Sequence, residues 1–457
     1  MNVKYHVTGL MYTRGHPSIY NNWAMHNKGW SYDEVLYYFK KSETNSEPPE
    51  YIEKEYHGFD GPLSVSRFPY LPDLAPCILD GAAELGYRIA DVNGHNQEAF
   101  TIAPIMVKDG VLASPNKQYL RPVLHRKNLR VLINSLAIKI TFDETGSRAT
   151  GVEFVEKWGN VKRFKAAKEV ILTAGVVGSP QLLLLSGVGP KEELNKHNIK
   201  MVRDLPVGDN LHYHVGFSVT VRLQGENKDS MTPESLHEYV TQHKGPFAST
   251  GLTQITGFVS SKFASKGVPD IQLYLDGYSG KCRNENSVNE TSDITFRPIY
   301  LITKCRGTIK LRSSNPYDKP LIDPNYLCDE EEINILIEAE EIIRNLTQTK
   351  AMKPKVVQWD VQENENCRRY KEKNKREYWS CVIREYTNGE NHHAGTCKMG
   401  PASDPCAVVD NELRVHGISN LRVADASIFP SPINCNTIAP VVMIGEKVSD
   451  MIRQTWK

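Results

Sequence analysis

Two pairs of histidines are the residues whose type and spacing could carry chemistry most directly. His392 and His393 lie in the segment 391–400, which also contains Gly395 and Gly400. Glycine lets the backbone approach a ligand closely, and a histidine beside a tight turn can act as a general base near neutral pH. Two solvent-exposed histidines in a loop would give the same dipeptide, and for the dipeptide alone that is the more frequent case.

The second pair, His212 and His214, has the alternating spacing that could ligate a metal. None of the nine cysteines forms a CxxC pair, so the cysteines do not indicate a structural zinc site. The sequence therefore predicts no metal centre. Because the number of cysteines is odd, at least one is expected to be unpaired or to pair between chains.

A turn of small residues could place a ligand at the start of a helix. Thr173-Ala174-Gly175 follows a predicted buried strand and leads into a helix that we expect to begin with Ser179 as N-cap and Pro180 in the first helical position. A helix N-terminus can bind a phosphate or support a stacked ring. Close packing of a strand against a helix would need the same small residues and is the more common reason for them.

The C-terminal region offers a second strand, loop and helix. Asp425 ends a predicted strand, and Asn434, Asn436 and Thr437 precede a helix predicted from Pro440 to Trp456. A helix N-terminus carries about half a positive charge. Directed at a bound group, it would stabilise negative charge that develops there during a reaction. Capping of the helix by Asn436 or Thr437 is the alternative reason for these residue types.

The elements that must position these residues follow from hydrophobic periodicity. Ser31 and Glu34 form a capping-box pattern, which predicts a helix start at this point. Further helices are expected at 76–86, 116–127 and 328–347, and strands at 128–133, 137–142, 151–155 and 169–173. Residues 215–304 alternate strand-like runs with polar loops.

Composition limits the classes of partner. The chain has 457 residues, 40% of them hydrophobic and 24% charged, with a formal net charge of +1. This length suggests two or three domains, and the charge gives no reason to expect a nucleic-acid partner. No apolar stretch approaches the roughly 20 residues of a membrane span. Residues 1–6 have no hydrophobic stretch of signal-peptide type, so the sequence as given predicts a cytosolic chain, while its actual location stays unknown.

Taken together, these clusters resemble the glucose–methanol–choline (GMC) oxidoreductases in their order along the chain and in their amino-acid sequence. The resemblance covers nearly the whole chain. Met11-Tyr12-Thr13-Arg14-Gly15, with Trp23-Ala24 and residues 29–32, is similar to the first signature of the family, and residues 178–189 to the second. Residues 392–400 resemble its catalytic-histidine segment, and residues 409–447 its C-terminal flavin segment. The sequence of these segments is most similar to the insect glucose dehydrogenase (FAD, quinone)-like branch of the family.

The resemblance implies an α/β and α+β fold with three parts. Residues 1–214 would form most of an FAD-binding domain of Rossmann type, and residues 215–390 most of a substrate domain with an antiparallel sheet. Residues 391–457 would complete the FAD domain and the active site. The implied cofactor is FAD, the implied substrate an alcohol or sugar, and the implied electron acceptor a quinone.

The resemblance also assigns roles to residues. His392 matches the base that removes the hydroxyl proton, and Asn436 matches the second active-site residue, which orients the alcohol oxygen. The implied cofactor contacts are a backbone contact of Ala137 to adenine, the turn at Thr173, Ala174 and Gly175, and the C-terminal residues Asp425, Ala426, Ser427, Asn436 and Thr437.

The sequence departs from the family pattern in two places. It contains no strand–GxGxxG–helix unit, and Thr8 stands where the family has an asparagine; Tyr213 stands where the family usually has an acid. Without that unit the cofactor diphosphate lacks a helix N-terminus, so we expect this chain alone to bind FAD weakly or not at all. A truncated, non-catalytic protein derived from the family, with a binding or structural role, is therefore the alternative function.

Overall fold

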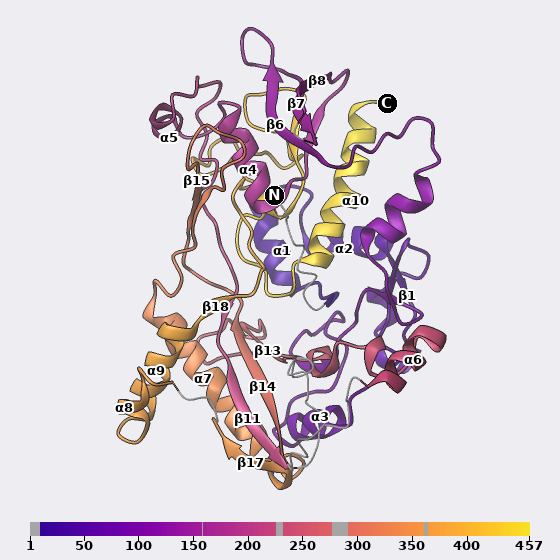
Figure 1. Ribbon diagram of the computed structural model, residues 1–457, viewed down its shortest axis with the longest axis vertical. Helices are drawn as coiled ribbons and strands as arrows, with labels where there is room; N and C mark the ends of the chain where they lie inside the picture. The colour runs from indigo at the N-terminus through magenta and orange to yellow at the C-terminus, as the bar shows by residue number, and fades with distance from the viewer. Residues whose placement is uncertain (1–9, 158, 225–231, 277–290, 361–363) are drawn as a thin grey trace.

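The computed structural model describes residues 10–157, 159–224, 232–276, 291–360 and 364–457. A three-stranded antiparallel sheet lies at one end of the long axis and a larger antiparallel sheet at the other, with helices between them (Figure 1). A short parallel strand pair belongs to the first end. This mixture of a parallel unit and a separate antiparallel sheet confirms the predicted fold class.

The first end is built from short strands and four helices. The three-stranded sheet contains β6 (Ser135–Phe142), β7 (Ala149–Glu156) and β8 (Val161–Lys165), and the parallel pair contains β9 (Val170–Leu172) and β19 (Leu421–Val423). The helices are α1 (Pro17–Ala24), α2 (Tyr32–Ser42), α4 (Gly175–Leu185) and α10 (Ile438–Thr455).

The larger sheet has the strand order β17-β11-β14-β13-β12-β3, with β10 pairing β14 and β18. Its strands are β3 (Ala99–Ile102), β10 (Val215–Gly216), β11 (Val219–Gln224), β12 (Ile255–Val259), β13 (Ile271–Leu275), β14 (Thr291–Tyr300), β17 (Val356–Trp359) and β18 (Asn388–Gly389). The helices α3 (Ala75–Glu84), α7 (Glu330–Thr347) and α9 (Lys375–Tyr386) share its hydrophobic core.

Smaller elements connect these units. They are the pairs β1 (Glu43–Asn45) with β2 (Leu63–Val65), β4 (Val107–Lys108) with β5 (Val111–Leu112) and β15 (Thr308–Lys310) with β16 (Leu321–Asp323), and the helices α5 (Lys191–Lys196), α6 (Pro233–Gln242) and α8 (Arg368–Lys371). The region predicted as helical at 116–127 forms a π-helical turn at Asn116–Leu120 and a 3₁₀ turn at Arg121–Val123.

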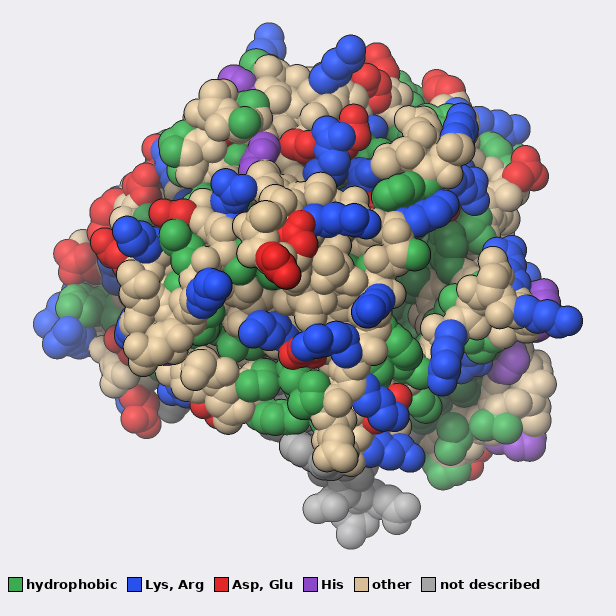
Figure 2. Space-filling view, turned by 90° about the horizontal axis from the view of Figure 1, so that it is seen from above, with side chains coloured by type: hydrophobic (Ala, Val, Ile, Leu, Met, Phe, Trp, Pro, Cys, Tyr) green, Lys and Arg blue, Asp and Glu red, His purple; other side chains and the backbone are tan. Residues whose placement is uncertain are grey.

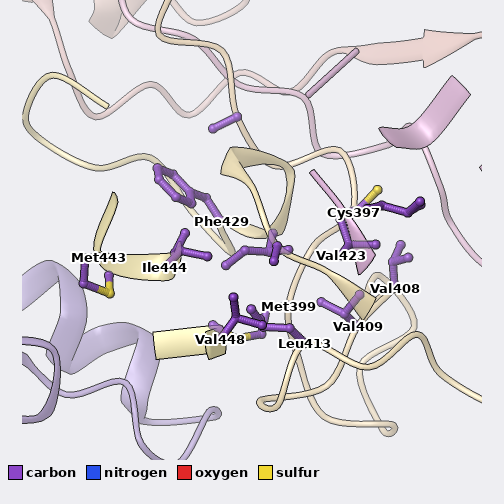
Figure 3. Packing of buried hydrophobic residues seen from close by; sticks show 14 of the residues in the cluster. Cys397, Met399, Val408, Val409, Leu413, Val423, Phe429, Met443, Ile444 and Val448 are labelled. Atoms are coloured by element: carbon purple, nitrogen blue, oxygen red, sulfur yellow. The ribbon is translucent and has the colours of Figure 1, made fainter. Parts of the chain in front are cut away.

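Two large hydrophobic clusters form the core. The first joins α1, α2, α4 and α10 with the C-terminal loops, and Figure 3 shows Cys397, Met399, Phe429 and Ile444 among its buried members. The second fills the space between the large sheet and α3, α7 and α9. Because α3 and β3 belong to the second cluster, part of the segment 1–214 packs with the antiparallel sheet. The domain boundaries themselves stay a prediction.

Local helix signals give one confirmed prediction and one correction. The capping box is present, since Glu34 accepts hydrogen bonds from the backbone N–H and hydroxyl of Ser31. The predicted N-cap at Ser179 is wrong, because α4 already begins at Gly175. Ser179 lies in the second turn and its Oγ accepts from the backbone N–H of Ala174 at 3.1 Å. Tertiary contacts therefore satisfy the first amides of the helix and let it start five residues earlier, at Gly175 instead of Pro180.

The strand predicted at residues 128–133 is wrong. In the part of the chain that the structure describes, no strand lies beside these residues. Val131 and Ile133 are 43% and 77% exposed. A strand needs a neighbour to satisfy its backbone N–H and C=O groups, and apolar alternation alone cannot provide one. The other three predicted strands have such neighbours and are confirmed as β6, β7 and β9.

Four of the cysteines form disulfide bonds within the described part of the chain. Cys305 pairs with Cys328, and Cys367 pairs with Cys381.

On the face seen in Figure 2, Lys and Arg side chains are scattered among Asp and Glu rather than gathered in one patch. Among the described residues, no helix is long and apolar enough to cross a membrane, and no group of three or more His, Cys, Asp or Glu side chains could hold a metal ion.

A buried network of charges fixes the first signature segment. The Arg14 guanidinium pairs with the Glu43 carboxylate, and both side chains are fully buried. The His57 ring lies between two carboxylates, with Nδ1 3.0 Å from Glu43 Oε1 and Nε2 2.8 Å from Asp91 Oδ2. Burial opposes the charged ring, but the hydrogen bonds to Asp91 and Glu43 prevail and raise the pKa of His57. Two cations and two anions therefore balance inside the core.

The stability of the fold should depend on the charge of His57. Because the pKa of His57 is raised on folding, its contribution is fully present below the unfolded value of about 6.5 and is lost as pH rises through the folded value. We expect His57→Gln to be less stable than the wild type at pH 6 by about 3–5 kcal/mol, since it leaves buried charge unpaired. The gap should shrink as pH rises, measured by denaturant unfolding across the pH range.

The matched control is His95→Gln. The His95 ring also pairs with a carboxylate, Glu53, but its side chain is 62% exposed. This variant should unfold as the wild type does at every pH. A stability gap for His57→Gln that is the same at all pH values would contradict the role assigned to the charged ring.

Candidate active site

Antiparallel pairing of two short strands brings His214 and His392 together. β10 follows His214 directly and β18 ends at Gly389, three residues before His392; Val215 pairs with Gly389. The pairing continues past β18, since the Glu390 N–H donates to the His214 carbonyl at 3.0 Å. The two rings then meet edge to face, with Nδ1 of one 3.0 Å from Nδ1 of the other.

Both histidines are buried, so His392 is not a surface histidine. Burial, with a smaller contribution from the neighbouring His393, lowers the pKa of His392 to about 4. Burial and the His392 ring hold the pKa of His214 well below its ordinary value. Both rings are therefore neutral at physiological pH, and a neutral imidazole has one donor and one acceptor nitrogen.

Asn436 is held in one orientation by donors from two distant segments. Its Oδ1 accepts from the Thr13 hydroxyl at 3.0 Å and from the Gln272 Nε2 at 3.1 Å. The side-chain nitrogen must then point the other way, and Asn436 Nδ2 lies 3.2 Å from His392 Nε2. The sequence predicted that His392 and Asn436 belong to one site, and the structure places them in contact.

The hydrogen-bond partners assign the proton on each ring. His214 Nε2 lies 2.7 Å from the Ile433 carbonyl, which only accepts, so this nitrogen carries the proton. The neutral His214 ring then offers a lone pair at Nδ1, and His392 must donate to it from its own Nδ1. The remaining nitrogen of His392, Nε2, is unprotonated and accepts from Asn436. An available base therefore lies beside an amide donor.

A pocket gives access to this pair. It has a volume of 280 Å³, and His392 and Asn436 line it together with residues of β13, β14 and the segment before His392. Asn391, next to the base, has a left-handed backbone (φ 56°), which asparagine tolerates better than most residues. The tight turn aims the His392 ring into the pocket. The arrangement can accept a proton from a hydroxyl group and donate a hydrogen bond to its oxygen.

The predicted cofactor residues lie in three places near this pair. Both oxygens of the Asp425 carboxylate accept hydrogen bonds from other residues of the chain. Its Oδ2 accepts from the Gly175 N–H at 2.9 Å and from the Ser179 hydroxyl at 2.6 Å, and its Oδ1 accepts from the Ser427 N–H at 2.8 Å. The carboxylate thus ties the turn after β19, which includes Ala426, to the turn before α4. It positions both turns rather than presenting a free charge.

The start of α10 fits the flavin end of the cofactor. Thr437 is the N-cap residue but makes no side-chain capping bond, so the helix N-terminus is left for another acceptor beside Asn436. At the other turn, Gly175 has φ +77°, and no atom lies within 4 Å of the position of a β-carbon. Thr173, Ala174 and Ala137 are exposed, and Ala137 lies on β6, an edge strand of its sheet. The residues present fit FAD at these positions.

Three residues of the site carried no assigned role from the sequence. Thr13 lies in the first signature segment, and Gly15 beside it lets this segment approach Asn434 closely, since a β-carbon there would lie 3.1 Å from Asn434 Oδ1. His214 was considered only as a metal ligand. Gln272 had no sequence signal, because a glutamine in a strand is ordinary and only the register of β13 brings it to Asn436.

Tyr213, the departure from the family pattern, also lies next to the site. Its ring packs against Tyr326 and His393, with centroids 5.3 and 5.6 Å apart. An apolar contact therefore replaces the acid that the family usually has at this place. His212, its other neighbour, forms a backbone bridge with Ala394, and its Nδ1 lies 2.9 Å from the Asn210 carbonyl.

Comparison with known proteins identifies the family. Models of the GMC oxidoreductases match residues 6–216 and 303–445. Glucose dehydrogenase [FAD, quinone] of Drosophila melanogaster is 39% identical over 98% of this chain and 73% of its own length. The chain belongs to the GMC oxidoreductase family. Human mitochondrial choline dehydrogenase is 34% identical over 98% of this chain and 74% of its own length.

Solved structures show the same fold. A formate oxidase of Aspergillus oryzae superposes with a TM-score of 0.86 at 23% identity, covering 98% of this chain and 82% of that one. A fungal aryl-alcohol oxidase superposes with a TM-score of 0.84 at 20% identity, covering 98% and 85%. The family assignment confirms the predicted class of this GMC protein: an FAD-dependent oxidoreductase that acts on CH–OH groups.

The proton positions can be read by nitrogen NMR. In protein labelled with ¹⁵N-histidine, we expect His392 at neutral pH to be the tautomer with the proton on Nδ1, and His214 the tautomer with the proton on Nε2. His392 should gain its second proton only with a pKa of about 4. Signals are assigned with His214→Gln and with the control His393→Gln, which should leave the His392 signal in place. A proton on His392 Nε2 at neutral pH would contradict the assignment.

Proposed function

We propose that this enzyme oxidises an alcohol or sugar with His392 as the base and passes the electrons to a quinone-type acceptor. The observation that carries the proposal is the unprotonated His392 Nε2, 3.2 Å from Asn436 Nδ2 in a pocket. A general base must be unprotonated at the working pH and within reach of the proton that it removes. The low pKa of His392 keeps the ring in that form.

The two side chains bind one hydroxyl group between them. When the alcohol binds, its O–H takes the place of Asn436 Nδ2 as the donor to His392 Nε2, and the alcohol oxygen accepts from Asn436 Nδ2 instead. Because Thr13 and Gln272 fix the amide, Asn436 cannot turn to present its oxygen instead. His392 takes the hydroxyl proton, and its Nδ1–H keeps the bond to His214, which holds the ring in place as it becomes charged.

FAD, when bound, accepts the hydride that leaves the carbinol carbon. Residues Thr437 and Asn436 at the start of α10 would hold the flavin end, where the helix N-terminus favours negative charge. The turn Thr173-Ala174-Gly175 with Asp425, Ala426 and Ser427, and the edge of β6 at Ala137, would contact the rest of the cofactor. Asp425 acts there by holding the turn in shape.

The quinone-type acceptor rests on the relatives. Glucose dehydrogenases of two Drosophila species, D. pseudoobscura and D. melanogaster, are 39% identical to this chain over almost its full length, and their names give FAD and quinone. The same relatives support a sugar as the substrate. A glucose:quinone activity is therefore the first to assay.

Replacing the base tests the proposal. In the FAD-loaded enzyme, His392→Ala should reduce the rate of alcohol oxidation by about 10²- to 10⁴-fold, the usual contribution of a general base. The flavin content should not change, since His392 faces the substrate pocket and not a cofactor turn. Both are measured on one preparation, by quinone reduction and by flavin absorbance.

His393→Ala is the matched control. This ring is next in sequence but packs on Tyr213, outside the pocket that His392 lines. Its turnover should stay within a few-fold of the wild type. Unchanged turnover in His392→Ala would remove His392 from the role of base and make His393 the next candidate.

A further inference from the structure

A cluster of charged side chains lies in the same pocket as His392 and Asn436. The pocket wall contains Glu390, two residues before the base, together with Tyr274 from β13, Asp276 directly after β13, and Arg297 from β14. Charged groups are costly to remove from water, so a pocket for a purely apolar alcohol would not contain them without a polar ligand to bind. The cluster therefore indicates what the rest of the substrate is like.

Glu390 is the fixed part of this cluster. Its side chain is 6% exposed, and both oxygens have partners: Oε1 accepts from Arg297 Nη2 at 2.6 Å, and Oε2 accepts from the Tyr274 hydroxyl. The carboxylate is therefore fully engaged by the protein. Its function in the cluster is to hold the Arg297 guanidinium in place at the pocket wall.

Arg297 and Asp276 keep unused hydrogen-bonding capacity. The Arg297 side chain is 22% exposed and lines the pocket; its Nε is buried, so the guanidinium can reach a ligand only through its Nη atoms. Asp276 lies 3.5 Å from Arg297 Nη1, too far for a strong bond, and its side chain is 51% exposed. The wall therefore offers one cationic donor and one anionic acceptor side by side. Two neighbouring hydroxyl groups of one ligand, one accepting and one donating, match this pair.

The geometry also disfavours other classes of alcohol. The Arg297 guanidinium covers the Tyr274 ring, 6.0 Å from its centroid, so the aromatic face is not available to a quaternary ammonium group. The pocket volume of 280 Å³ is near the lower end of the roughly 300–1,000 Å³ that is usual for ligand sites, which suits one small ring.

We propose that Arg297 and Asp276 form a subsite for vicinal hydroxyl groups, and that the substrate is a neutral polyhydroxylated alcohol the size of one monosaccharide. This inference rests on the proposed function for the position of the reacting hydroxyl, between His392 and Asn436. The subsite itself binds the hydroxyl groups that do not react. Arg297 and Asp276 therefore determine which alcohol binds, and Glu390 positions Arg297.

Binding without turnover tests the subsite. FAD-loaded protein is reduced with dithionite under anaerobic conditions, so that no alcohol is oxidised, and titrated in a calorimeter with D-glucose and with cyclohexanol. Cyclohexanol keeps a six-membered ring and one hydroxyl but has no vicinal pair. Asp276→Asn and Arg297→Met should weaken binding of D-glucose by about 10- to 100-fold, because the first replaces a charged acceptor with a neutral one and the second removes a charged donor. Binding of cyclohexanol should change less than about threefold.

Two variants guard against a general loss of structure. Arg297→Met leaves the Glu390 carboxylate buried without its cation, so it is combined with Glu390→Gln; Asp276→Asn affects a half-exposed side chain and needs no compensation. The matched control is Arg222→Met, in the same sheet, where the exposed pair with Asp293 lies outside the pocket. This control should bind D-glucose as the wild type does.

The outcomes separate the subsite from the reaction. Unchanged affinity of Asp276→Asn for D-glucose, an equal loss for cyclohexanol, or tighter wild-type binding of choline than of D-glucose would overturn the subsite even if His392→Ala loses turnover. If His392→Ala keeps its turnover while Asp276→Asn loses D-glucose selectively, the subsite stands and the proposed role of His392 fails.

Discussion

A chain of hydrogen bonds in which every donor and acceptor is fixed is the constraint on which the active site depends. It begins at the Leu273 carbonyl, which accepts from the Thr256 hydroxyl at 3.2 Å, and continues through Gln272 to Asn436. From Asn436 it passes to the two histidines and ends at the Ile433 carbonyl. Both ends are backbone carbonyls, which only accept. Each proton between them therefore has one consistent position, and that position leaves the lone pair of His392 Nε2 facing the pocket.

The two halves of the fold supply different parts of this chain. β12 and β13 of the large sheet bring Thr256 and Gln272, while the loop before α10 brings Asn436 from the other core. The first signature segment lies between them, and the buried pair of Arg14 with Glu43 holds it there. Because the members come from separate cores, the site exists only when both cores are packed together. Burial in this junction is also what lowers the pKa of His392 to about 4.

The sequence predicted the residues of the site that act on the substrate, but not the residues that orient them through hydrogen bonds. His392 and Asn436 could be assigned because the sequence around each resembles a family signature. Gln272 and the orientation of His214 could not, since hydrogen bonds across 164 and 178 residues depend on sheet register rather than on local pattern. The same limit explains the errors in the fold. Ser179 looked like a helix start because the hydrogen bond from the Gly175 N–H to Asp425, 250 residues away, cannot be predicted from the local sequence.

Local sequence patterns predicted structure correctly where all the residues that form the interaction lie within a few positions of one another. The capping box of Ser31 and Glu34 needs only four residues, and it is present in the structure. Residues 128–133 have the apolar alternation of a strand but no neighbouring strand in the described part of the chain, so the pattern was insufficient. Function follows the same rule. A histidine next to a glycine turn becomes a base only through its partners in three dimensions.

The central claim is that Asn436 donates to His392 and so keeps its Nε2 free of a proton. The most direct measurement is the pH dependence of kcat/KM for alcohol oxidation by Asn436→Asp. A carboxylate still accepts from Thr13 and Gln272 but cannot donate to His392, and it stabilises the charged ring. The account predicts that the acidic limb of the profile moves up by about one to three pH units relative to the wild type. An acidic limb at the wild-type position would contradict it.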